Sequence, residues 1–461
     1  GASANINYFI DKKSWSKTVD IYTESNSPIR VYYHYEDNQL VDCCTRSKDN
    51  NEAYIKYTTH TNSAYFNPSP SYGQGSYTGG DGTTTTLWTY TTDSEGNATI
   101  TGYKGSASSL AIPSVIDGYT VTGIGYNAFA ICTNLKAVTI PDSVTTIGSG
   151  AFEDCTNLYS VSMSKGLCRL EQYAFENCTK LNNIFIPKSL ESCGAGSYGG
   201  PFYNCTSLNN VIFEDGITQL PGNLFYGCPG LTDITIPDTV TEIEYQAFRK
   251  CTNLKTVTIP DSVTKIDNFA FFDDTGLTEI KIPNSVTSMG ENIFSGCTSL
   301  EKVKLPDTCK TIMSNTFRQC KKLKDIVLPE TVTTIKGDAF FGCASLPSIN
   351  LPDGLQTIES GAFYECKALT DITIPKNVTS IGTSAFYNCD SLQTAVINAS
   401  GTVGSQAFYD CDALTSLTLA DSITKIGSSL CYSCDKLTDI KFGKYITEIP
   451  DSAFRKCAAL Q

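Results

Sequence analysis

The stretch IPDSVTTIGSGAFEDCTNLYSV, which runs from Ile140 to Val161, recurs with small changes through most of the 461-residue chain. We call the position of its cysteine, Cys155, the ladder position. Successive ladder cysteines are 23 residues apart, except for single intervals of 27, 46 and 22 residues. They are Cys132, Cys155, Cys178, Cys205, Cys228, Cys251, Cys297, Cys320, Cys343, Cys366, Cys389, Cys411, Cys434 and Cys457. A fixed period of this length indicates a repeat architecture.

The interval of 46 residues, between Cys251 and Cys297, is twice 23, and the skipped ladder position holds Asp274. Asp274 lies in FFDDTGLTEI, from Phe271 to Ile280, which contains the Asp-Thr-Gly signature of an aspartic protease. Such an enzyme needs a second, facing carboxylate to share a proton, and the chain has no second Asp-Thr-Gly. We therefore predict no catalytic residues, and we expect Asp274 to accept hydrogen bonds from backbone amides of the turn.

Each rung carries Leu three residues after the ladder position and Phe three residues before it, except where Cys431 replaces Phe. An apolar-polar-apolar segment ending in Pro follows, such as Val257 to Pro260, which predicts a strand with one buried face. The AFxxC segment is too short for an independent helix, so we expect a single turn of α- or 3₁₀-helix there. Because one unit cannot bury its apolar side alone, the units are expected to stack into a solenoid.

The pattern AFxxCxxLxxVxIPxxVTxIG resembles the BspA-like, or Treponema-type, leucine-rich repeat of bacterial surface proteins, over about residues 107–461. The segment LWTYTTDSEGNATITGYKG (87–105) resembles the β-hairpin cap of such arrays, and residues 112–125 resemble their first turn. The resemblance implies an α+β repeat fold: a leucine-rich-repeat solenoid with a parallel sheet face and short helical turns over 127–461, preceded by a cap and first turn over 87–126. It also implies adhesion to host matrix proteins or to other cells.

Composition excludes several classes of partner. The net charge of −13 and the pI near 4.7 make nucleic acid and anionic lipid poor ligands. No run of 18 apolar residues is present, so we predict no membrane insertion. The chain begins Gly-Ala-Ser-Ala, as expected after removal of an export signal, and we predict an extracellular or cell-surface location.

The cysteines are expected to be reduced and buried. Ladder side chains point the same way into the core, whereas a disulfide needs side chains that face each other, and a free thiol behaves as a small hydrophobe. Cys193, Cys309 and Cys431 also fall on core positions, and Cys168 falls one residue past such a position. Zinc and other cofactors are not expected, because the chain has two histidines and its one CxxC pair, Cys431 and Cys434, is explained by the register of the repeat. For the adjacent residues Cys43 and Cys44, a disulfide between the two remains an alternative.

Residues 1–84 do not repeat, and their aromatic and β-branched segments predict a small β-sandwich followed by a Pro/Gly/Ser/Thr-rich linker over about residues 67–86. The phrase YFIDKKSWSKTVDIY resembles the opening of starch-binding carbohydrate modules. This resemblance implies glycan binding through exposed aromatic side chains, for which the candidates are Trp15, Tyr32, Tyr33 and Tyr35. The alternative is that these side chains are ordinary core residues of a sandwich.

The outward-pointing positions of the strands are mostly small and polar, but Tyr159, Phe185 and Ile212 lie on three successive rungs. The insertion GAGSYGG, residues 194–200, lengthens a neighbouring repeat and contributes Tyr198. An exposed apolar cluster can mark a contact surface, although aromatic residues also simply suit a sheet surface. We predict a non-catalytic, exported surface protein that binds host or bacterial surface proteins through the solenoid. The alternative is glycan binding through the N-terminal module.

Overall fold

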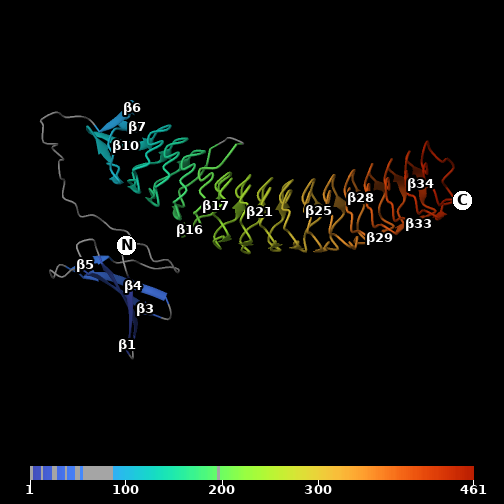
Figure 1. The fold of residues 1–461 in the computed structure, drawn as a ribbon, viewed down its shortest axis with the longest axis horizontal. Helices are drawn as coiled ribbons and strands as arrows, with labels where there is room; N and C mark the ends of the chain where they lie inside the picture. The colour runs from blue at the N-terminus through green and yellow to red at the C-terminus, as the bar shows by residue number, and fades with distance from the viewer. Residues whose placement is uncertain are drawn as a thin grey trace. The chain divides into compact units, whose positions relative to one another are not determined.

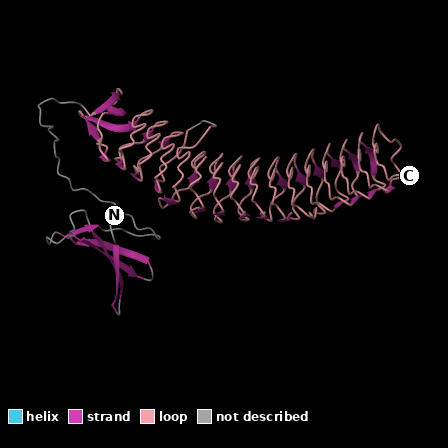
Figure 2. Ribbon diagram, viewed as in Figure 1, coloured by secondary structure: helices cyan, strands magenta, loops and turns pink. Residues whose placement is uncertain are grey.

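The computed structural model gives the backbone of residues 4–11, 14–22, 28–36, 39–46 and 52–55, and backbone with side chains for residues 87–194 and 198–461. The chain divides into two compact units, Gly1–Tyr77 and Thr78–Gln461. Throughout these described ranges there are strands but no helices. Figure 2 shows the second unit as a long stack of rungs linked by short strands. The second unit is therefore a β-solenoid.

The first unit contains one five-stranded antiparallel sheet in chain order. Its strands are β1 (Ala4–Asp11), β2 (Ser14–Tyr22), β3 (Pro28–Glu36), β4 (Gln39–Arg46) and β5 (Glu52–Ile55). A β-sandwich over residues 1–84 requires a second packed sheet and stays a prediction. The expected linker, about residues 67–86, lies outside the described residues.

A typical rung of the solenoid has three sides, and the first is the short strand that follows the ladder position. These strands pair in parallel with the next rung, so that Val138 is the register partner of Val161. They are β8 (Ser109–Ala111), β11 (Ala137–Thr139), β13 (Ser160–Ser162), β15 (Asn183–Ile186), β16 (Asn210–Phe213), β18 (Asp233–Thr235), β20 (Thr256–Thr258), β22 (Glu279–Lys281), β24 (Lys302–Lys304), β26 (Asp325–Val327), β29 (Asp371–Ile374), β31 (Thr394–Ile397), β33 (Ser416–Leu419) and β35 (Asp439–Lys441). The rung after β26 has no such strand; its Pro347 lacks an N–H for pairing, whereas the equivalent Lys324 amide bonds the Glu301 carbonyl at 3.1 Å.

The second side is formed by a shorter strand, mostly of two residues, from the VTxI segment. These strands are β10 (Tyr119–Ile124), β12 (Thr146–Ile147), β14 (Arg169–Leu170), β17 (Gln219–Leu220), β19 (Glu242–Ile243), β21 (Lys265–Ile266), β23 (Ser288–Met289), β25 (Thr311–Ile312), β27 (Thr334–Ile335), β28 (Thr357–Ile358), β30 (Ser380–Ile381), β32 (Gly401–Val403) and β34 (Ile423–Ile426). At the N-terminal end of the stack, β6 (Trp88–Thr92) and β7 (Asn97–Tyr103) form an antiparallel hairpin, and β9 (Val115–Ile116) pairs with β10. β7 pairs in parallel with β10 (Figure 1), so the hairpin continues the second side.

The third side is the turn that contains AFxxC, and here the expected helical turn is wrong. The backbone amides of the turn alternate between bonds to the next rung and bonds within their own rung. The N–H of Phe152 donates to the Ala174 carbonyl on the next rung, whereas the N–H of Cys155 donates to the Phe152 carbonyl of the same rung. In addition, most rungs hold two residues with positive φ, one and five positions before the ladder position, such as Asp154 and Gly150. Left-handed residues and amides committed to the neighbouring rung are both incompatible with a continuous helix.

The interior of the solenoid is a column of stacked rings beside a column of thiols. Ladder-associated phenylalanines from Phe129 to Phe408 stack on one another with ring centroids 4.9–6.1 Å apart. Trp88 and Tyr103 of the hairpin contact Phe129 and cover the first end of this column. All cysteines of residues 87–194 and 198–461 are free, as expected, and each ladder cysteine is buried except the half-buried Cys132. Cys193, Cys309 and Cys431 are buried too, and Cys168 is half-buried.

Candidate functional site

The strand face brings together two of the three residues predicted there. Phe185 on β15 and Ile212 on β16 are register partners, and both are half-buried. Tyr159 is exposed, but it precedes β13, and its amide bonds the Lys136 carbonyl. Tyr159 therefore stands at the entrance to the strand side, three positions before the column that contains Phe185 and Ile212.

The insertion lies on the turn side of the solenoid rather than on the strand face. Tyr198 is 79% exposed. A Cβ atom added to Gly199 would stand 2.3 Å from Cε1 of Tyr173 and 2.9 Å from Cδ2 of Tyr203, so only glycine lets the loop lie against both rings. Tyr173 and Tyr203 meet edge to face, with centroids 5.7 Å apart. The insertion thus adds the exposed ring of Tyr198 next to the half-buried rings of Tyr173 and Tyr203.

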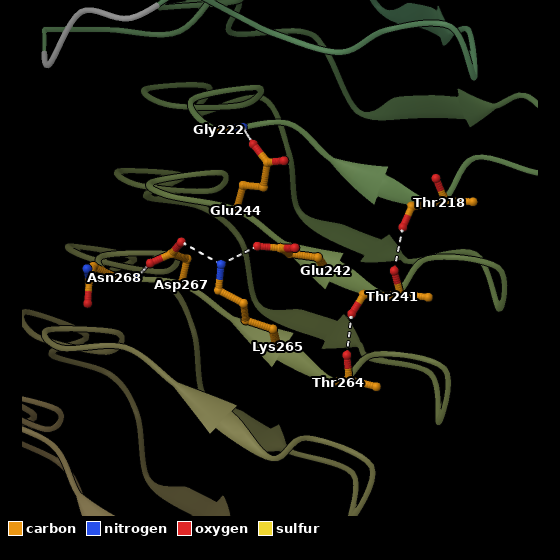
Figure 3. A network of polar contacts seen from close by, with 9 residues as sticks. All are labelled: Thr218, Gly222, Thr241, Glu242, Glu244, Thr264, Lys265, Asp267 and Asn268. Carbon is orange, nitrogen blue, oxygen red and sulfur yellow. Dashed lines mark hydrogen bonds and ion pairs between the residues drawn. The ribbon is translucent and has the colours of Figure 1, made fainter.

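A polar network on the second side ties rungs together (Figure 3). The ammonium group of Lys265 lies between the carboxylates of Glu242 and Asp267, 3.2 Å from Asp267. Glu244 accepts the backbone N–H of Gly222 at 2.9 Å, and burial raises its pKa. The hydroxyl of Thr241 donates to the Thr218 carbonyl, as that of Thr264 does to Thr241. Each carboxylate here has a partner, and no nucleophile stands beside a base, so the network is structural.

Asp274 is buried completely and cannot reach a substrate. Its Oδ1 accepts the backbone N–H of Cys251 at 2.8 Å, which confirms the expected amide hydrogen bond. Burial raises the pKa of Asp274 well above its usual range. Across residues 87–194 and 198–461, no three side chains of His, Cys, Asp or Glu gather as a metal site would require.

A column of aromatic side chains lies on the turn side, at a position that the sequence analysis did not single out. We define the turn column as the residues two positions before the ladder position. In its first half the rings of Tyr203 and Tyr226 meet edge to face, with centroids 6.3 Å apart. The guanidinium carbon of Arg249 then lies 5.0 Å from the Tyr226 ring and 4.8 Å from the Phe272 ring. Such contacts are cation–π interactions.

The second half of the turn column is a flat stack of five rings, which we call the tyrosine stack: Phe341, Tyr364, Tyr387, Tyr409 and Tyr432. Successive centroids are 4.6, 4.6, 4.8 and 4.7 Å apart, and the planes are within 4° of parallel. Every ring is half-buried. Neighbouring ring faces cover one another, so the stack presents edges and hydroxyl groups to its surroundings.

A cationic side chain packs against the terminal ring at each end of the tyrosine stack. The guanidinium carbon of Arg318 lies 3.9 Å from the centroid of Phe341, and the Lys456 ammonium lies 5.2 Å from that of Tyr432. Among the side chains that the structure describes, none hydrogen-bonds to the hydroxyl groups of Tyr364, Tyr387, Tyr409 or Tyr432. The stack therefore presents a row of phenol groups that are available to another molecule. Its signal in the sequence was an aromatic residue two positions before five consecutive ladder cysteines.

The four aromatic residues proposed for glycan binding lie on neighbouring strands of the first unit. Trp15 on β2 is the register partner of Tyr35 on β3, and Tyr32 and Tyr33 are also on β3. Their side chains lie outside the described residues. The vicinal cysteines Cys43 and Cys44 fall on β4, and their side chains are outside them as well.

The rung pattern and the solenoid define a leucine-rich-repeat protein, and the chain belongs to the BspA type leucine rich repeat region family. The family matches residues 103–231, 218–347 and 333–461, and its description specifies six copies. A comparison with curated proteins found no match. No helix in the described ranges is long and apolar enough to cross a membrane.

Two solved structures illustrate the similarity. A leucine-rich repeat protein from Bacteroides ovatus is 27% identical, with a TM-score of 0.54, and the match covers 72% of this chain and 93% of that one. A leucine rich cell surface protein from Faecalibacterium prausnitzii is 30% identical, with a TM-score of 0.44, and the match covers 82% of this chain and 93% of that one. The first supports the solenoid fold independently of the rung pattern.

Proposed function

We propose that this protein is an exported, non-catalytic surface protein that adheres to host or bacterial surface proteins through its solenoid, with the tyrosine stack as the main contact surface. The observation that carries the proposal is the row of four tyrosine hydroxyls on a stacked aromatic column, with no hydrogen-bond partner among the side chains that the structure describes. Tyrosine is enriched in protein interfaces because it combines apolar area with a polar tip. Rings already held by stacking lose little conformational entropy on binding.

The architecture supports recognition over a large area. A solenoid presents an extended surface built from many similar units, and this one has its polar groups paired along the second side, as around Lys265. Nothing in the described site geometry combines a nucleophile, a base and an accessible cavity. The buried Asp274 has no exposed surface. Contact with another macromolecule is the function this surface fits best.

An array of matrix proteins, bacterial surface proteins and glycans, probed with the whole protein, tests the proposal. We expect binding to protein spots that falls at least about fivefold in Tyr387→Ala/Tyr409→Ala, since interface tyrosines commonly contribute more than 1 kcal/mol. The variant Tyr159→Ala/Tyr198→Ala removes two exposed rings of the contact surface predicted from the sequence and compares that surface with the tyrosine stack. Loss in this second variant alone would overturn the assignment to the tyrosine stack, and binding to no protein spot would overturn adhesion.

Glycan binding by the first unit is the second candidate function, and the register pairing of Trp15 with Tyr35 favours it, because it places two aromatic residues side by side on neighbouring strands. Retention of the whole protein on a starch or glucan column, and its loss in Trp15→Ala, would support this function. Retention that survives in Trp15→Ala/Tyr35→Ala would contradict it.

A further inference from the structure

The rungs that carry the tyrosine stack also carry five carboxylate side chains next to their ladder cysteines, and we call these carboxylates the acidic margin. They stand directly before or after the ladder cysteine of the same rungs: Glu365, Asp390, Asp410, Asp412 and Asp435. Of these five, Asp390 alone has an ion pair, with Lys367 at 3.3 Å. The remaining four have no cationic partner within ion-pair distance among the side chains that the structure describes.

The carboxylates of the margin lie close enough to influence one another. Burial, followed by the charges of Asp390, Asp410 and Asp435, raises the pKa of Asp412, and the charge of Lys436 offsets part of this increase. Burial, followed by the charges of Glu365 and Asp410, likewise raises the pKa of Tyr364. Like charges held together in this way repel, and a cation that binds among them removes the repulsion.

We propose that the tyrosine stack and the acidic margin together form a docking surface for a Lys/Arg-rich segment of a partner protein, a specificity that rests on the proposed adhesive function. Charge complementarity selects the partner: four unpaired carboxylates attract cationic side chains. Lysine and arginine also carry apolar stems, which suit the edges of the stacked rings. The stack itself already holds such cations at both ends, with Arg318 over Phe341 and Lys456 over Tyr432.

The same geometry disfavours other occupants. A sugar needs a free ring face, and the inner faces of the stack are covered by neighbouring rings at 4.6–4.8 Å. A metal ion needs converging ligands, and the described carboxylates form no such group. Anionic lipid would be repelled by the acidic margin. A basic polypeptide satisfies both the charges and the ring edges.

The test measures binding of fluorescein-labelled decalysine to the whole protein by fluorescence anisotropy, with decaglutamate as the charge-reversed probe. In Asp410→Asn/Asp412→Asn/Asp435→Asn we expect affinity for decalysine to fall about tenfold, because three of the negative charges that attract the probe are removed. Asparagine keeps the left-handed backbone of Asp410, whose φ is 52°. Binding should weaken as salt rises.

The matched control is Asp238→Asn/Asp261→Asn/Asp353→Asn, which removes three exposed aspartates on the loops between the first and second sides. Both triple variants change the net charge equally. If the docking surface is local, the affinity of the control for decalysine should therefore stay within about twofold of that of the parent protein. Equal loss in both variants, or no binding of decalysine to the parent, would overturn the inference. Such a result would leave the array test of adhesion unaffected, so the two proposals fail separately.

Discussion

The carboxylate of Asp274 accepts the backbone N–H of Cys251 from the preceding rung at 2.8 Å. A cysteine at the ladder position donates a hydrogen bond instead of accepting one. The Sγ of Cys297, for example, donates to the Phe271 carbonyl at 3.1 Å. Asp274 therefore replaces a hydrogen-bond donor with an acceptor. Its second oxygen, Oδ2, is buried with no hydrogen-bond partner in the described structure, and burial raises the pKa of the carboxyl group well above its usual range.

Asp274→Cys should stabilise the solenoid. Restoring the ladder thiol removes a buried, half-satisfied carboxyl group, so we expect the free energy of unfolding at pH 7 to rise by about 1–3 kcal/mol. Because the folded-state pKa of Asp274 is raised, its contribution to stability is present below the ordinary value of 3.8 and is lost as the pH rises through the folded-state pKa. The advantage of the variant should therefore grow between about pH 4 and pH 7.

Urea unfolding of the parent protein and the variant at both pH values measures this difference. Asp261→Asn, at an exposed position, is the control and should change the free energy of unfolding by less than about 0.5 kcal/mol. A variant that is less stable than the parent at pH 7 would show that the Cys251 hydrogen bond outweighs the burial of the carboxyl group.

The ladder thiols should resist alkylation in the folded protein. Burial raises the pKa of Cys228 to about 12, and burial followed by the neighbouring Cys132 raises that of Cys155 to about 12, whereas the thiolate is the reactive form. Among the described cysteines, iodoacetamide at about pH 8 should modify the half-buried Cys132 and Cys168 first. Peptide mass spectrometry identifies the modified sites, and unfolding in urea provides the control in which all should react. Fast modification of Cys228 in the folded protein would contradict the buried ladder.

Ile131→Asn should also stabilise the protein. Ile131 is 69% exposed and has a φ of 61°, a conformation that β-branched residues adopt at a cost. Asn177 and Asn204 occupy the equivalent position on later rungs. We expect a gain of about 1 kcal/mol in unfolding free energy, measured by thermal or urea unfolding. Ile131→Thr, which keeps the β-branch, should gain much less, and equal gains would point to hydrophobic exposure instead of backbone strain.

Two substitutions of Tyr387 distinguish the structural role of the tyrosine stack from its role in binding. Tyr387→Phe keeps both stacking contacts, at 4.6 and 4.8 Å, and should change stability by less than about 0.5 kcal/mol. Tyr387→Ala removes both contacts and should lower stability by about 1–3 kcal/mol. Thermal unfolding measures both effects. Equal stability of the two variants would mean that the stack contributes contact surface without stabilising the fold.

Local pattern was sufficient for the solenoid and for the hydrogen bond that Asp274 accepts from a backbone amide. The 23-residue spacing, the Phe and Leu positions and the free thiols follow from one rule, that each rung must bury its apolar side against the next. The turn conformation did not follow from that rule. The amide of Phe152 bonds Ala174, 22 residues later, and a contact between rungs of this kind overrides the local tendency of AFxxC to form a helical turn.

The candidate binding surface also depends on contacts between neighbouring rungs. Sequence analysis predicted an apolar contact surface from Tyr159, Phe185 and Ile212, and it did not consider the position two before the ladder. Stacking places the ring of Tyr387 4.6 Å from that of Tyr364 and 4.8 Å from that of Tyr409. Such a column cannot be recognised while each rung is considered alone.

The sequence by itself determined the repeat, the residues that line its core and the pairing of one rung with the next, because burial of apolar side chains is dictated by local composition and period. Only the tertiary structure decided which outward residues meet, how the turn amides are shared and that Asp274 is left with an unpaired oxygen. These features depend on distances between residues about one repeat apart, which are fixed when the rungs stack.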